Sequence, residues 1–117
     1  STVLQVRRKE TNEIFAMKMI KKSKIKKLHQ ERHIQRELCI LPQLDHQNII
    51  KLYGTFETET RLYLILEYCP GGELFFHLSN RGAFNESTTK IYAAQLILAL
   101  EYLHKRNIIY RDLKPEN

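Results

Sequence analysis

The sequence predicts an α+β fold in which a small antiparallel sheet with one main helix precedes a mostly helical part. Within residues 1–66, β-prone runs and a helical pattern follow one another in the order strand, strand, helix, strand, strand. That order fits a sheet with a helix packed on it. A Pro-Gly-Gly break at residues 70–72 then separates this part from one whose periodic patterns are almost all helical.

The first twenty residues are typical of a β-hairpin. β-prone runs at 3–6 and 14–20 flank a polar, turn-rich stretch at 9–13. In the second run Lys18 shares a face with apolar residues, so it is a charge among apolar neighbours. From the residues alone, a lysine that reaches water along the sheet edge is an equally good interpretation. The predicted faces are Ile14, Ala16, Lys18 and Ile20 on one side and Phe15, Met17 and Met19 on the other.

Residues 21–27 contain five lysines. Such a run could bind the phosphates of nucleic acid or of lipid headgroups, or serve as a nuclear address. No aromatic residue interleaves the lysines, so this segment offers no surface on which bases could stack. We therefore favour a solvated connector here and predict no nucleic-acid partner.

A helix and two further strands follow. Apolar residues recur at helical spacing over 30–41, with Glu37 beside the stripe, and strands are predicted at 49–56 and 62–66 around a turn at 57–60. The apolar stripe consists of Ile34, Leu38 and Leu41, and Pro42 ends the pattern.

Beyond the glycines we predict a short helix over 72–80, a turn at 81–82, and a long helix that Asn85 caps and that runs to about Lys105. The long helix is apolar around most of its circumference, and such a helix needs cover on most sides. Two short neighbours cannot supply that cover. We therefore expect an exposed apolar patch, with self-association or dependence on a chaperone.

Composition limits the class of protein. The chain has 117 residues, a net charge of +6 and 43% hydrophobic residues, which excludes an intrinsically disordered tail. No apolar run approaches the roughly 20 residues of a membrane helix, and no secretion signal is visible. Two cysteines, Cys39 and Cys69, are too few for a disulfide scaffold. A reducing compartment is expected, the cytoplasm, with the nucleus left open.

Residues 110–117, Tyr-Arg-Asp-Leu-Lys-Pro-Glu-Asn, are the most informative stretch. They match the pattern H-R-D-L-x-x-x-N at every position except the first. In this stretch the sequence resembles the catalytic loop of the eukaryotic protein kinases, enzymes that transfer the γ-phosphoryl group of ATP.

Further matches occur in the order that this family requires. Residues 15–18, Phe-Ala-Met-Lys, resemble its V-A-I-K strand, and Glu37 lies on the following helix. Residues 67–69 resemble the hinge, after Leu66 at the gatekeeper position. Segments elsewhere are similar to the cyclic-nucleotide-dependent kinases and protein kinase B, the AGC-type serine/threonine kinases. These segments are Pro-Gly-Gly-Glu-Leu-Phe at 70–75, Tyr-Ala-Ala-Gln at 92–95 and Glu-Tyr-Leu-His at 101–104.

The resemblance divides the chain into a small lobe at 1–66, a hinge at 67–72 and the start of a large lobe at 73–117. It also implies roles for five residues. Lys18 would hold the α- and β-phosphates of ATP, with Glu37 orienting it. Asp112 would accept the proton of the substrate hydroxyl, Lys114 would stabilise the transferring phosphoryl group, and Asn117 would bind Mg²⁺.

The resemblance further implies contacts with adenine, ribose and substrate. Glu73 would contact the ribose, and Glu73 and Glu116 would meet basic side chains of protein substrates. The residues expected around adenine are Val3, Ala16 and the gatekeeper Leu66, with hinge backbone contacts at Glu67 and Cys69.

Most of the family's Gly-rich loop and its D-F-G and A-P-E elements are absent from these 117 residues. We therefore expect no phosphate transfer from this segment alone. A non-catalytic pseudokinase or scaffolding module is the main alternative, and a basic interaction module that uses the lysine run is the third.

Overall fold

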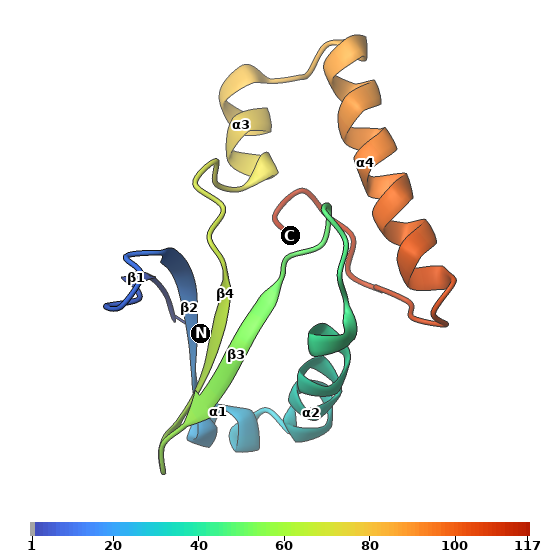
Figure 1. Ribbon diagram of the computed structural model, residues 1–117. Helices are drawn as coiled ribbons and strands as arrows, with labels where there is room; N and C mark the ends of the chain where they lie inside the picture. Colours follow the sequence, from blue (N-terminus) through green and yellow to red (C-terminus); the bar gives the residue numbers. More distant parts are fainter. Residues whose placement is uncertain (1) are drawn as a thin grey trace. The chain divides into compact units, whose positions relative to one another are not determined.

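The computed structural model describes residues 2–117 (Figure 1). The chain forms two compact units. The first comprises the described residues up to Asp45 together with Ile49–Cys69, and the second comprises His46–Asn48 and Pro70–Asn117. The main boundary between the two units lies between Cys69 and Pro70, which is inside the predicted hinge segment 67–72.

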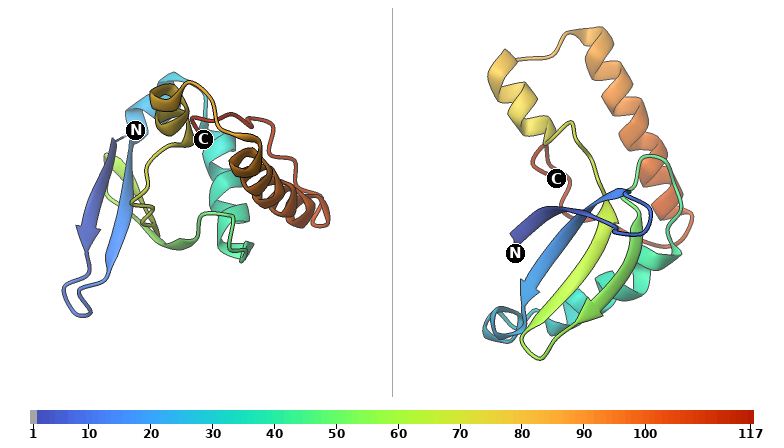
Figure 2. Two further views of the ribbon diagram at one scale, coloured as in Figure 1. Left: turned by 90° about the horizontal axis from the view of Figure 1, so that it is seen from above. Right: turned by 60° about the vertical axis from the view of Figure 1, so that its left-hand side comes forward.

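A four-stranded sheet forms the framework of the first unit. Its strands lie in the order β1-β2-β4-β3, and each pair of neighbours is antiparallel, as the right-hand view of Figure 2 shows. This sheet and its helices confirm the predicted α+β class. The strands are β1 (Thr2–Arg7), β2 (Ile14–Lys21), β3 (Leu52–Glu57) and β4 (Arg61–Glu67).

Helices cover one face of this sheet. α1 (Lys22–Lys27) and α2 (Glu31–Ile40) follow β2, and a 3-10 turn, η1 (Leu41–Gln43), follows α2. The core lies between sheet and helices, with Leu64 only 1% exposed. Its buried members are Ile20, Leu62 and Leu64 from the strands and Ile25 from α1, and the predicted stripe of Ile34, Leu38 and Leu41 packs against them.

The lysine run, which we expected to be a solvated connector, is largely exposed to solvent, but most of it is helical. It forms α1, because Ile25 in its middle is buried in the core and fixes the turn against the sheet. The sequence pattern could not predict this helix, since one apolar residue among five lysines gives no periodicity.

The strand predicted from residue 49 begins at Leu52 instead. The ladder between β3 and β4 is irregular at this point: Leu52 pairs with Leu66, but Gly54 already pairs with Ile65. Tyr53 is therefore an extra residue, a β-bulge, and its ring packs edge-on against Phe15 with the centroids 4.9 Å apart.

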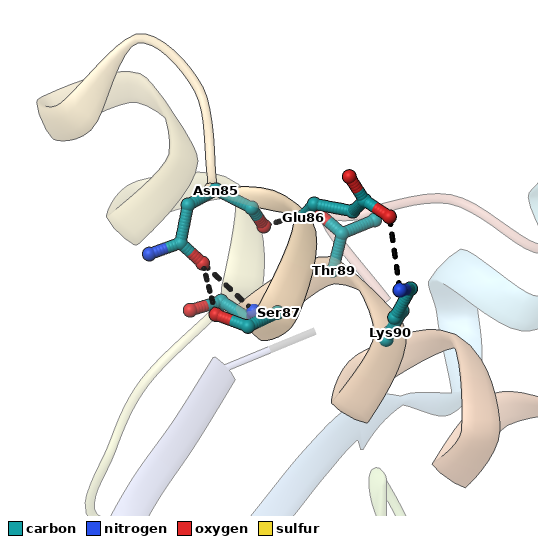
Figure 3. A network of polar contacts seen from close by, with 6 residues as sticks. Asn85, Glu86, Ser87, Thr89 and Lys90 are labelled. Atoms are coloured by element: carbon teal, nitrogen blue, oxygen red, sulfur yellow. Dashed lines mark hydrogen bonds and ion pairs between the residues drawn. The ribbon is translucent and has the colours of Figure 1, made fainter.

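The second unit contains α3 (Leu74–Arg81) and α4 (Glu86–His104). α3 starts two residues later than predicted and ends at Arg81, where Gly82 with a φ of 74°, a conformation that favours glycine, terminates it. Asn85 caps α4 as predicted: its side-chain oxygen accepts hydrogen bonds from the backbone N–H of Thr88, 2.8 Å away, and from the Ser87 hydroxyl, 2.9 Å away (Figure 3).

Much of the apolar surface of α4 is exposed to solvent. Only Ala99 and Leu103 of this helix are buried, whereas Ile97 is 65% and Ile91 61% exposed. The expected exposed patch is therefore present in the described chain. None of the helices among residues 2–117 is long and apolar enough to cross a membrane.

Candidate active site

An ion pair joins β2 to α2 in the first unit. The ammonium nitrogen of Lys18 lies 3.3 Å from Oε1 of Glu37, and the two side chains are 27% and 36% exposed. Lys18 lies on the helix-facing side of the sheet because it shares its face with buried Ile20, one pleat further along β2. The alternation therefore places this lysine where α2 can supply a partner, and the partner is the predicted glutamate.

The residues predicted to surround adenine lie in adjacent rows of the sheet. Val3 pairs with Lys18 across β1 and β2, and Lys18 pairs with Leu64 across β2 and β4. One row further, Ala16 pairs with Leu66. Opposed residues of an antiparallel pair lie on the same face, so Val3, Ala16 and Leu66 share the face of Lys18. Val3 itself is 60% exposed, so space remains above it.

β4 ends at Glu67, where the predicted hinge begins. The Glu67 N–H donates to the carbonyl of Lys51 at 2.9 Å, and its carboxylate accepts from the Lys51 N–H at 3.3 Å. These two bonds fix the end of the strand. Cys69 follows with an exposed, unpaired thiol. Desolvation, and secondly the Glu67 carboxylate, raise the pKa of the Cys69 thiol, so this cysteine is not an activated nucleophile.

In the second unit, the loop at residues 110–117 holds the Asp112 carboxylate from both sides. The Lys114 ammonium lies 3.2 Å from Oδ1, and the Asn117 amide nitrogen donates to Oδ2 at 2.8 Å and to the Asp112 carbonyl at 3.0 Å. The Asn117 backbone N–H also donates to the Lys114 carbonyl at 3.0 Å, which closes a turn. Residues 112, 114 and 117, which the sequence analysis assigned to one catalytic loop, thus form one hydrogen-bonded group.

This arrangement keeps Asp112 ionised. The hydrogen bond from Lys114, and after it the one from Asn117, lower the pKa of the Asp112 carboxyl below its ordinary value. A carboxylate that stays charged at neutral pH can accept a hydrogen bond from a substrate hydroxyl and orient it.

The side-chain amide of Asn117 is oriented in a way that fits its predicted role as a magnesium ligand. Its amide nitrogen faces two Asp112 oxygens, so the amide oxygen is directed away from them. An amide oxygen is a ligand that Mg²⁺ accepts. No cluster of three or more His, Cys, Asp or Glu side chains that could hold a metal occurs among residues 2–117.

Two features of this loop were missed by the sequence analysis. Arg111 has a φ of 67°, an unusual left-handed conformation for arginine, immediately before Asp112. The Phe75 N–H, in the first turn of α3, donates to the Pro115 carbonyl at 3.0 Å. No local sequence signal could have revealed either one, since the second contact joins residues forty positions apart and arginine is not a typical turn former.

The Phe75–Pro115 bond brings the segments of two predicted substrate-binding residues together. Glu73 precedes the first residue of α3, and Glu116 follows Pro115, so the two glutamates flank this bond. Both are exposed. Glu73 makes no side-chain capping bond to α3, which leaves its carboxylate available to a ligand.

Comparison with known proteins gives one family and many relatives. Residues 1–117 match the protein kinase domain. Protein kinase 2 of Dictyostelium discoideum is 47% identical over 115 residues, which cover 98% of this chain and 24% of that protein. The RAC family serine/threonine-protein kinase homolog of the same organism is 45% identical over 98% of this chain and 26% of its own length. The human cAMP-dependent protein kinase catalytic subunit PRKX is 44% identical over 96% of this chain and 31% of its length.

The chain spans between about a quarter and a third of the length of these three relatives. All three matches cover nearly the whole of this chain. The activity that a complete relative carries therefore rests on more residues than these 117.

Proposed function

This chain belongs to the protein kinase family, and on that basis we propose that the whole protein transfers the γ-phosphoryl group of ATP to serine or threonine in basic protein substrates. The family and the AGC-type resemblance predicted from the sequence are confirmed by the relatives. The reaction, the basic substrates and the roles of single residues are our proposal.

The observation that carries the proposal is the group formed by Asp112, Lys114 and Asn117. In the proposed step, the Asp112 carboxylate accepts the proton of the substrate hydroxyl while that oxygen forms a bond to the γ-phosphorus and the bond to ADP breaks. Phosphoryl transfer of this kind is mainly positioning, so a weakly basic but well-held carboxylate is suitable. Lys114, 3.2 Å from that carboxylate, would place a positive charge beside the transferring group.

The Lys18–Glu37 pair supports a second part of the proposal, the binding of ATP. Glu37 directs the ammonium group of Lys18, and that group has three donors, so it can hold Glu37 and phosphate oxygens together. Val3, Ala16 and Leu66 would contact adenine on the same face of the sheet, with backbone contacts at Glu67 and Cys69. Bound magnesium would neutralise phosphate charge, with Asn117 as one ligand.

Basic substrates are proposed because of the Glu73 and Glu116 carboxylates. The Phe75–Pro115 hydrogen bond joins their segments, and both carboxylates are exposed on a chain whose net charge is +6. Two negative charges on a chain whose net charge is positive favour the binding of a substrate's arginine or lysine side chain, because the electrostatic potentials are complementary. Glu73 would also contact the ribose.

The test is phosphate transfer from ATP to a serine peptide with upstream arginines, measured with the whole protein. We expect Asp112→Asn to lower kcat by at least about 100-fold, since a general base typically contributes that much. Glu10→Gln, at an exposed position, is the matched control and should leave kcat unchanged. Full activity of Asp112→Asn, or ATP binding without transfer by the unaltered protein, would instead favour a pseudokinase or scaffold.

The 117 residues contain no Asp-Phe-Gly sequence, whose aspartate binds magnesium in the family's template. We propose that they form the small lobe at 1–66, the hinge at 67–72 and the first part of the large lobe at 73–117, and that this segment alone turns over no ATP. Turnover by the purified segment, with contaminating kinase excluded, would contradict this.

The exposed apolar surface of α4 supports self-association or chaperone dependence of the isolated chain. Ile91 and Ile97 are the most exposed large apolar residues of this helix. Sedimentation should show a concentration-dependent assembly that Ile97→Lys weakens, and a strictly monomeric chain would oppose the idea. The two free thiols support a reducing location, which we propose is the cytoplasm, with the nucleus open.

A further inference from the structure

The segment that covers residues 21–40 holds nearly all of the excess charge of this chain. It contains seven Lys and Arg residues against two Glu residues, so five of the chain's six net positive charges belong to Lys21 at the end of β2 and to α1, α2 and the residues between them. The proposed catalytic function uses one charged residue of this segment, Glu37. The remaining charge therefore has no role in phosphate transfer.

Most of these basic side chains have no polar partner among residues 2–117. Lys22 forms an ion pair with Glu57, with 3.0 Å between Nζ and Oε2, but the side chains of the other four lysines form no ion pair or hydrogen bond with those residues. We call these four residues the lysine surface: Lys21, Lys24, Lys26 and Lys27, all exposed. Arg32 and Arg36, on the outer face of the adjoining helix α2, are exposed and unpaired as well and line a shallow hollow of about 390 Å³.

The fold fixes the direction of the lysine surface. Ile25 is buried against Ile20, Leu62 and Leu64, so the remaining side chains of the short helix α1 are turned outward. The Lys22–Glu57 pair and the bond from the Lys22 N–H to the Thr60 carbonyl, at 2.9 Å, tie the start of α1 to the turn between β3 and β4. The lysines are thus presented by an anchored element and not by a loose chain.

We propose that the lysine surface binds the anionic face of a lipid bilayer. Lysine is a compact, hydrated charge suited to a diffuse negative surface, whereas specific phosphate sites favour the planar fork of arginine. Leu28 follows the last lysine and is 49% exposed, so it provides an apolar side chain that can enter the interface. No Phe, Tyr or Trp occurs between 21 and 40, and no aromatic ring lies within the lysine run at 21–27, so the lysines lack a neighbouring platform for stacked bases, which disfavours nucleic acid.

The experiment is cosedimentation of the chain with phosphatidylcholine vesicles that contain no anionic lipid or about 30% phosphatidylserine. We expect binding only to the anionic vesicles, and a steep decrease when NaCl rises from about 50 mM to about 500 mM, because the Debye length shortens over that range. Binding that does not depend on phosphatidylserine would overturn the proposal.

A pair of triple variants separates the lysine surface from net charge. Lys24→Gln/Lys26→Gln/Lys27→Gln should weaken vesicle binding on the order of 100-fold, since each lysine near the membrane contributes about fivefold. The matched control, Lys9→Gln/Lys90→Gln/Lys105→Gln, removes the same charge from exposed positions elsewhere and should change binding by less than about threefold. Equal losses in both variants would show that only net charge matters.

Two further measurements complete the test. Ser23→Asp adds a negative charge among the lysines at an exposed position and should weaken vesicle binding about fivefold. Single-stranded RNA and duplex DNA, offered at the same salt, should bind more weakly than the vesicles, and tighter binding to either would replace the proposal. Circular dichroism of each variant shows whether it is folded. None of these measurements depends on ATP or on phosphate transfer, so their failure leaves the proposed kinase activity untouched.

Discussion

The amide nitrogen of Asn117 donates to the carboxylate of Asp112 across 2.8 Å. With the Lys114 ammonium on the other carboxylate oxygen, this bond fixes the one acidic group that the proposed reaction requires. Its effect on the pKa of Asp112 gives the first prediction.

Lys114→Met should raise the pKa of Asp112 toward its ordinary value, and Asn117→Ala should raise it by less, because the Lys114 bond is the larger cause of the lowered value. Side-chain carboxyl NMR titration measures both. Since the pKa is lowered in the folded loop, the stabilisation from these bonds is present above the ordinary aspartate pKa. It is lost as the pH falls through the lowered value. Unchanged titration in Lys114→Met would contradict this assignment.

Lys18→Met should reduce the affinity of the whole protein for ATP, because it removes the charge proposed to hold the α- and β-phosphates. The ion pair with Glu37 is partly exposed, so the free energy of unfolding should change by no more than about 1 kcal/mol. Calorimetric ATP titration and chemical denaturation distinguish the two effects. Glu37→Gln is the companion variant, and a large loss of stability with intact ATP binding would show a structural role instead.

Glu73→Gln and Glu116→Gln should each raise the KM of the whole protein for a peptide with upstream arginines by about tenfold, at nearly constant kcat. A charged contact to substrate is lost, but the groups around Asp112 are unaffected. A peptide with alanine in place of the arginines provides the control, since its KM should not respond. If both peptides respond equally, the glutamates do not select basic substrates.

Asn85→Ala should destabilise the start of α4 by about 1 kcal/mol, because the Thr88 N–H loses its acceptor. Amide exchange of residues 86–90 should accelerate, whereas the strands of the first unit should be unaffected. Asn85→Asp keeps an acceptor oxygen at the same place and should preserve protection. Equal exchange in all three proteins would mean that this cap contributes nothing measurable.

Local patterns were sufficient for much of the fold, whereas the roles of the candidate site residues were predicted from the resemblance to the protein kinases. Alternation placed Lys18 on the correct face of β2, helical spacing placed Glu37 beside Leu38, and Asn85 alone marked the start of the long helix. Each of these features depends on residues within a few positions along the chain, so the local sequence is sufficient to predict it.

Tertiary contacts account for what the patterns did not predict. The burial of Ile25 makes a helix of the lysine run, and the Phe75–Pro115 bond depends on the folded second unit. Neither is encoded within a short window, because the partners are distant along the chain. The left-handed Arg111 likewise opposes the intrinsic preference of its residue type.

The extra residue in β3 has a genetic consequence. Tyr53 has no partner of its own in the ladder with β4, so loss of its single in-frame codon would leave Leu52 opposite Leu66 and Gly54 opposite Ile65. Leu52 would keep its place against the core, and the protein would lose only the bulge and the tyrosine ring that packs on Phe15. A deletion scan should therefore find position 53 more tolerant of removal than position 64 in the central strand β4, where loss of one residue exchanges the faces of the residues on one side of it.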